Sequence, residues 1–234
     1  LYALDGYYVM VAGHNGAFSQ EPYTLTVQVD PPAPQAACQR TLPFSGTPGV
    51  RYQPYPADLV ETIILFPKQR LEQMYGTAAA APLAGRVQAL ADHATVKGLV
   101  LPLELEPGVV ESFADWDNGK VCDPETANAV AGAIKTLLAQ TLNSYPHVHN
   151  LIIVGSDEVI PFRRLPDMTQ TSNERDYAQQ ALVKADTALF ASLQQGYVLS
   201  DDFYADLEPT PYNGRPLYVP NFALGRLVET PAEM

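Results

Sequence analysis

An acidic run near the end of the sequence carries the residue types best suited to binding a metal ion. Asp201, Asp202 and Asp206 place three carboxylates within six residues. Clustered carboxylate oxygens suit Ca²⁺, which takes about six to eight oxygen ligands. The sequence therefore predicts a structural calcium site at these three residues. The alternative is that the carboxylates cap helices and accept hydrogen bonds in loops.

A second acidic pair, Asp157 and Glu158, follows a predicted strand. Basic partners for both acidic groups are present, because the sequence also contains Arg163, Arg164 and Arg226. Arginine and carboxylate side chains are buried in proteins when they are paired and hydrogen-bonded. The sequence therefore leaves two interpretations of these carboxylates open, which are buried ion pairs with arginine and metal binding.

Two histidines suggest a different kind of metal site. His147 and His149 are two residues apart, which on a strand places both rings on one face. Such a pair chelates a metal only with a third ligand, and no acidic residue or cysteine lies close to it in the sequence. We therefore expect half-exposed histidines that pack at the start of a strand.

The two cysteines, Cys38 and Cys122, lack the surroundings of a catalytic nucleophile. A catalytic thiolate needs an adjacent imidazole to accept its proton, and neither cysteine follows a predicted strand with a histidine nearby. The sequence does not distinguish between one disulfide that joins the two cysteines and two separate thiols. The sequence therefore predicts no catalytic residue and no cofactor-binding residue in this chain.

Several enzyme classes are disfavoured by missing motifs. The sequence has no G-x-G-x-x-G and no G-x-x-x-x-G-K-[ST], the backbone cradles of dinucleotides and nucleoside triphosphates. It also lacks H-E-x-x-H, paired C-x-x-C and G-x-S-x-G, which argues against common zinc hydrolases, structural zinc modules and α/β-hydrolases.

The elements that must position these residues alternate between strands and helices from about residue 58. We expect strands over 61–66, 98–103, 149–154 and about 221–223. We expect helices over 67–74, 82–93, about 186–195, and one that begins after an N-cap at Asp123. Apolar strands joined by helices predict a doubly wound α/β domain with a mainly parallel sheet and helices on both faces.

Ligands of such domains bind at the carboxyl ends of the strands. The positions to inspect are therefore 66–67, 103–104, 155–158 and 225–226. A flavodoxin-like domain that binds a small ligand through residues 155–158 is one further interpretation.

The chain divides into three regions by sequence pattern. Residues 1–30 predict a β-hairpin that completes a β-sandwich lying upstream or packs on the following domain. Residues 31–57 predict a Pro-rich linker, and residues 58–234 the α/β domain. Thr230, followed by Pro231 and Glu233, predicts a helix start with a capping box. Because Met234 follows at once, we expect this chain to be a piece of a longer polypeptide.

Composition excludes two kinds of partner. Hydrophobic residues make up 47% of the chain and charged residues 17%, which is typical of a globular protein. The net charge of −12 repels phosphate backbones, so nucleic acid is not an expected partner. The apolar runs are strand-length, far below the roughly 20 residues of a membrane helix, so we expect no membrane span.

Three segments together resemble a known family. They are Leu151–Pro161, with its Val-Gly-Ser-Asp and Ile-Pro, Leu199–Asp206, with its Ser-Asp-Asp-Phe-Tyr, and Tyr218–Arg226, with its Gly-Arg before the helix start. In this order and spacing the region 58–234 resembles the gingipain-type cysteine peptidases. The hairpin over 1–30 resembles the last strands of the bacterial pre-peptidase C-terminal domain.

The resemblance implies a caspase-like α/β fold, which shares its mainly parallel sheet with flavodoxin-like domains. It also implies a secreted bacterial endopeptidase whose catalytic His and Cys lie downstream of Met234, so that this chain is the N-terminal, non-catalytic half. Family members bind structural calcium.

This sequence departs from the family at Ser156, where an Asp is common, with Asp157 one place later. The implied partners are the catalytic subdomain of the same polypeptide and protein or peptide substrates. The alternative is an inactive caspase-like adhesion or interaction module.

Overall fold

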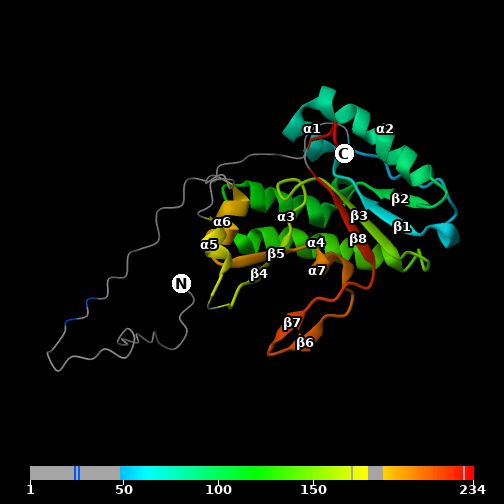
Figure 1. Ribbon diagram of the computed structural model, residues 1–234. Coiled ribbons are helices and arrows are strands. Elements are labelled where there is room, and N and C mark those ends of the chain that lie inside the picture. Colours follow the sequence, from blue (N-terminus) through cyan, green and yellow to red (C-terminus); the bar gives the residue numbers. More distant parts are fainter. Residues whose placement is uncertain (1–23, 25, 27–47, 170, 179–186, 229) are drawn as a thin grey trace. The chain divides into compact units, whose positions relative to one another are not determined.

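The computed structural model describes residues 24, 26, 48–169, 171–178, 187–228 and 230–234 (Figure 1). Apart from residues 24 and 26, the hairpin expected over 1–30 lies outside the described residues, as does the expected linker up to residue 47.

Four parallel strands form the central sheet. They are β1 (Thr62–Leu65), β2 (Gly98–Leu101), β3 (Asn150–Val154) and β8 (Ala223–Leu227). Their order is β2-β1-β3-β8, so the chain moves outward in opposite directions from β1 and β3 (Figure 1). This doubly wound arrangement confirms the predicted α/β fold with a parallel sheet.

Helices connect and cover the strands. They are α1 (Lys68–Tyr75), α2 (Thr77–Asp92), α3 (Pro107–Asp117), α4 (Pro124–Leu142), α5 (Glu174–Ala178), α6 (Ala188–Gln194) and α7 (Asp202–Ala205), with short 3₁₀ turns η2 (Ala57–Leu59) and η3 (Leu103–Leu105). The predicted cap of α4 is present, because the Asp123 side chain accepts a hydrogen bond from the Glu125 amide. Helix α2 begins at Thr77, five residues before the expected start, because the alanines at 78–81 favour helix and Pro82 is accommodated inside it.

Two adjacent residues of β1 show that helices cover both faces of the sheet. Ile63 packs toward α4, where it lines a small hollow with Leu138 and Leu142. Ile64 packs toward α2, since its side chain and Ala91 lie beside Gly98. Successive strand residues point to opposite faces. All four residues of β1 are buried, as expected for a parallel strand between two helical layers.

Two short antiparallel pairs lie outside the central sheet. One joins β4 (Arg163–Pro166) to β5 (Tyr197–Ser200), and the other joins β6 (Thr210–Tyr212) to β7 (Arg215–Leu217). Asn213 and Gly214 both have positive φ in the β6–β7 turn, as a tight hairpin requires. These pairs were not expected from the sequence, because their strands are three or four residues long.

The two edges of the central sheet differ. The outer edge of β2 is bridged by Tyr52, which exchanges two backbone hydrogen bonds with Val100. Within the described residues, β8 pairs on one side only, with β3. A search of the described helices found none with the length and apolar character needed to cross a membrane.

Candidate functional site

A tight loop at the carboxyl end of β3 is the core of the candidate site. Gly155 follows the strand with a φ of +122°, and an added Cβ would lie 2.4 Å from Cγ1 of Val159. Only glycine tolerates both the backbone conformation and this close approach. The amides of Val159 and Ile160 both donate to the carbonyl of Ser156. The loop is therefore a compact turn that presents its carbonyl groups to neighbouring elements.

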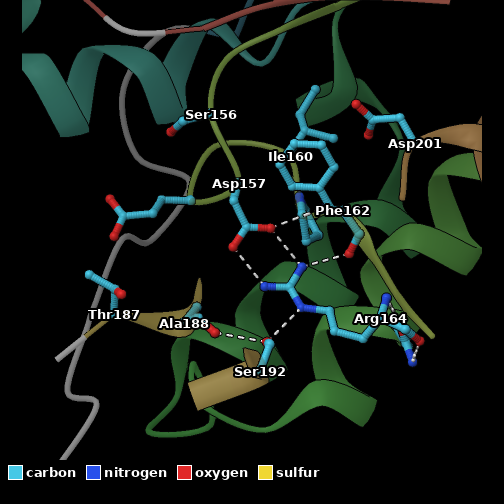
Figure 2. Close-up of polar contacts among 12 residues, drawn as sticks. Ser156, Asp157, Ile160, Phe162, Arg164, Thr187, Ala188, Ser192 and Asp201 are labelled. Atoms are coloured by element: carbon cyan, nitrogen blue, oxygen red, sulfur yellow. Dashed lines mark hydrogen bonds and ion pairs between the residues drawn. The ribbon is translucent and has the colours of Figure 1, made fainter. Parts of the chain in front are cut away.

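Asp157 and Arg164 form a buried, two-pronged ion pair beneath this loop (Figure 2). Both Nη–Oδ distances are 2.7 Å, and the exposed fractions of the two residues are 7% and 1%. Asp157 also accepts from the Phe162 amide, and Arg164 Nε donates to the Ser192 hydroxyl. The carboxylate that follows β3 therefore anchors β4 and α6 to the loop.

A second, partly buried arginine ties β8 to the same loop. Arg226 Nε lies 2.7 Å from Asp201 Oδ2, and its Nη1 donates to the carbonyls of Gly155 and Ile160 at 2.8 Å. The guanidinium lies 4.1 Å from the centre of the Phe162 ring. Three acceptors and an aromatic face thus satisfy this charge inside the protein. The ion-pair interpretation of Arg164 and Arg226 is confirmed.

Tyr204 adds a link between α7 and the loop. Its hydroxyl donates a short hydrogen bond to the carbonyl of Pro161, and the side chain is almost fully buried. Burial raises the pKa of this hydroxyl well above its ordinary value, because the phenolate would lose its hydration. Tyr204 is therefore a structural hydrogen-bond donor rather than a proton-transfer group near neutral pH.

The three aspartates proposed for calcium have different surroundings. Asp201 is engaged by Arg226, and Asp206 is buried, accepting from the amides of Glu208 and Val219 at 2.7 Å. Asp202 is exposed at the start of α7. In the described part of the chain, no group of three or more His, Cys, Asp or Glu side chains is placed to hold a metal ion. Calcium binding at these residues stays a prediction.

The histidines lie at the opposite end of the sheet. His149 precedes β3, and its Nδ1 lies 2.8 Å from the carbonyl of His147. The fold brings Glu61 to 4.0 Å from His149 Nε2, an acidic neighbour that sequence proximity could not reveal. A hydrogen bond from Lys97 lowers the pKa of Glu61. The pair thus lies in a surface charge cluster away from the candidate site.

One buried arginine was missed by the sequence analysis. Arg70 of α1 is fully buried, pairs with Asp117 at 2.6 and 2.9 Å, and donates from Nε to the carbonyl of Glu158. Its guanidinium also lies over the rings of Phe113 and Trp116. It joins α1 and α3 to the loop after β3. No local pattern in the sequence marks Arg70 as buried, because its partner Asp117 lies 47 residues away.

Together these contacts describe a rigid framework rather than a reactive centre. The buried arginines and carboxylates around the loop are engaged with one another. Cys122, the cysteine within the described residues, is disulfide-bonded, while Cys38 lies outside them. What the framework can do is fix the carboxyl end of β3 relative to β8.

In comparisons with known proteins, no family model matches the chain, and neither a curated protein nor a solved structure matches it significantly.

Proposed function

We propose that this chain is the N-terminal, non-catalytic half of a secreted gingipain-like cysteine endopeptidase, with the catalytic His and Cys downstream of Met234. The observation that carries the proposal is the meeting of the three segments on which the resemblance depends. Arg226 contacts Asp201 and the carbonyls of Gly155 and Ile160. Residues that are up to 71 positions apart thus form one hydrogen-bonded cluster. This contact gives a structural reason for the order and spacing of the three segments in the sequence.

The edge of β8 that pairs with no strand among the described residues supports the same proposal. Ala223 and Gly225 of this strand are exposed, and the edge carries no proline, lysine or bulge that would block pairing. After β8 the chain enters a turn, in which the Thr230 amide and hydroxyl donate to the Glu233 carboxylate and the Glu233 amide donates to the Thr230 carbonyl. The Glu233 half of the predicted capping box is thus present, whereas the Thr230 hydroxyl donates instead of accepting. If this turn opens a helix, as the sequence predicts, a right-handed crossover would place a further parallel strand beside β8.

In the proposed enzyme this chain positions the catalytic half and does not itself react. A downstream thiolate would attack the peptide carbonyl after an imidazole accepts its proton, and backbone amides would stabilise the oxyanion. The role of the Arg226 cluster is to hold β8 rigidly where the catalytic subdomain joins the sheet. Structural calcium and protein substrates belong to this proposal.

A non-catalytic interaction module is the second candidate, and the β6–β7 hairpin favours it. Tyr212, Leu217 and Val219 are 62%, 47% and 55% exposed. Leu217 is paired directly with Thr210, which lies two residues before Tyr212 in β6. The side chains of residues 212 and 217 therefore lie on the same face of the hairpin. Exposed apolar side chains concentrated on one face are typical of a protein-binding surface.

Active-site labelling of the full-length gene product distinguishes the two. We expect a biotinylated peptidyl acyloxymethyl ketone to label a cysteine that follows the second strand after residue 234, with a His-Gly after the first. Replacing that cysteine with alanine should abolish labelling. The variant Arg226→Lys should reduce it, since lysine cannot reproduce the forked contacts, whereas the exposed Arg215→Lys should not.

Equal labelling of the wild type and the Cys→Ala variant would overturn the peptidase proposal. So would a downstream sequence without the ordered His-Gly and Cys, provided that circular dichroism shows a folded protein. That second result would support the interaction module.

A further inference from the structure

Residues 48–56 form a strap along one edge of the central sheet. Tyr52 exchanges backbone hydrogen bonds with Val100 of β2 at 3.2 and 2.8 Å. The hydroxyls of Tyr52 and Tyr55 donate to Asp92 at the end of α2, each at 2.7 Å. The strap thus covers the outer edge of β2, within a region that the sequence analysis assigned to a linker.

A buried carboxylate fastens the strap at the carboxyl end of the sheet. Glu104, in the η3 turn after β2, is 8% exposed. Its Oε1 accepts hydrogen bonds from the Gly49 amide at 2.8 Å and from the Gln69 amide at 3.3 Å. A Cβ at Gly49 would lie 3.0 Å from this oxygen and 3.0 Å from Pro102 Cβ. The strap therefore packs tightly against the carboxylate.

The second oxygen of this carboxylate has no partner. Glu104 Oε2 is buried without a hydrogen bond among the described residues. An unpaired buried oxygen carries a large desolvation penalty when it is charged and a smaller one when it holds a proton. The geometry favours the acid form, with Oε1 accepting both amide hydrogen bonds and Oε2 protonated. Burial accordingly raises the pKa of Glu104, against the smaller opposing effects of the amides and of Lys68.

The charged groups on the surrounding elements are engaged elsewhere. Lys68 on α1 lies 2.9 Å from Glu72, and Arg70 pairs with Asp117 of α3. Arg51 on the strap faces Glu106, beside η3, at 3.8 Å. Each of these groups therefore faces a partner of opposite charge other than Glu104.

We propose that the strap docks with a proton bound at Glu104 Oε2, so that docking is tightest in mildly acidic solution and weakens as the pH rises. Releasing the strap lets Glu104 ionise in water, where its pKa is ordinary. The stabilisation of the docked state is therefore complete below that ordinary pKa and is lost as the pH rises through the raised pKa of the docked state. Release would also expose the outer edge of β2 for strand pairing. The proposal is independent of the peptidase assignment.

Hydrogen exchange measured by mass spectrometry from pH 5 to pH 8, corrected for intrinsic exchange rates, tests this proposal. In the wild type we expect the protection of peptides covering residues 48–56 to fall as the pH rises, by up to about tenfold for each unit that the pKa is raised. The variant Glu104→Gln resembles the protonated acid in shape and charge, so its strap should stay protected at all pH values. The matched control Glu111→Gln, at an exposed position of α3, should behave as the wild type does.

A carboxyl ¹³C NMR titration of the wild-type protein keeps the test independent of any variant. We expect Glu104 to titrate above the ordinary range of a glutamate, because its carboxyl group is buried. A Glu104 that titrates within or below that range would overturn the proposal. Strap protection that does not change with pH in the wild type, or that changes equally in Glu104→Gln, would overturn it as well.

Discussion

Arg226 of β8 and Asp201 at the start of α7 form a partly buried, two-pronged ion pair, with exposed side-chain fractions of 6% and 11%. The same guanidinium reaches the loop after β3. One side chain therefore fixes the relative positions of an edge strand, a helix start and the candidate site. The cluster depends on arginine, because lysine lacks the planar fork that meets several acceptors at once.

Truncating one partner of this pair should destabilise the fold strongly. We expect Arg226→Ala and Asp201→Ala each to lower the free energy of unfolding by about 3–5 kcal/mol, because each leaves an uncompensated buried charge. The double variant should cost less than the sum of the two single variants. Urea unfolding followed by circular dichroism measures these values, and Arg215→Ala on the exposed hairpin is the control. Additive single effects would show that the two residues do not interact.

Two glycine substitutions should have opposite effects. Gly155→Ala forces a Cβ into Val159 at a positive φ, so we expect a loss of at least about 2 kcal/mol in unfolding free energy. Gly132 lies inside α4, where an added Cβ meets nothing within 4 Å. Gly132→Ala should therefore stabilise the protein by about 0.5–1 kcal/mol. Thermal and urea unfolding compare the two, and a neutral Gly155→Ala would contradict the tight-turn assignment.

Local signals in the sequence predicted the framework well. Apolar runs located β1, β2 and β3, and the capping residue Asp123 marked the start of α4. The last strand was expected at about 221–223 but spans Ala223–Leu227. Gly225 and Arg226 looked unlike strand residues, and their roles depend on partners elsewhere in the chain.

Long-range pairing was not visible in the sequence. The Arg70–Asp117 pair spans 47 residues, and Glu104 meets Gly49 across 55. Nothing local distinguishes these charged residues from solvent-exposed ones, because their burial is decided by which helices and loops pack together. The ion-pair alternative for Arg164 and Arg226 was available from residue types alone, but the choice of partners required the fold.

A calcium titration tests the predicted site at Asp201, Asp202 and Asp206. Because Asp201 and Asp206 already accept hydrogen bonds, a cation would have to exchange those contacts. We therefore expect weak binding, with a Kd of about 10⁻⁴–10⁻³ M. Isothermal titration calorimetry with CaCl₂ should give a signal that Asp202→Asn removes and that the exposed control Asp115→Asn retains. A signal unaffected by Asp202→Asn would place calcium at another site, and no signal in the wild type would mean that calcium does not bind.

Tyr204 should make the protein sensitive to alkaline pH. Its pKa is raised above the ordinary value of 10.0 because the hydroxyl is buried, so the folded protein keeps a proton that the unfolded chain releases. The stabilisation from this group is complete below pH 10 and is lost as the pH rises toward the raised pKa. We expect Tyr204→Phe to lower the free energy of unfolding by about 0.5–1.5 kcal/mol at pH 7, because the hydrogen bond to Pro161 is lost. Above pH 10 the difference between the wild type and the variant should become smaller, because the wild type then loses the stabilisation from Tyr204.

Urea unfolding at pH 7, 9, 10 and 11 measures this difference, and Tyr212→Phe is the matched control because Tyr212 is 62% exposed. The control should show no such change with pH. A constant difference between wild type and Tyr204→Phe across the series would mean that Tyr204 ionises in the folded protein as readily as in the unfolded chain. The hydroxyl would then have to reach solvent, and the contact between α7 and the loop after β3 would be looser than the structure describes.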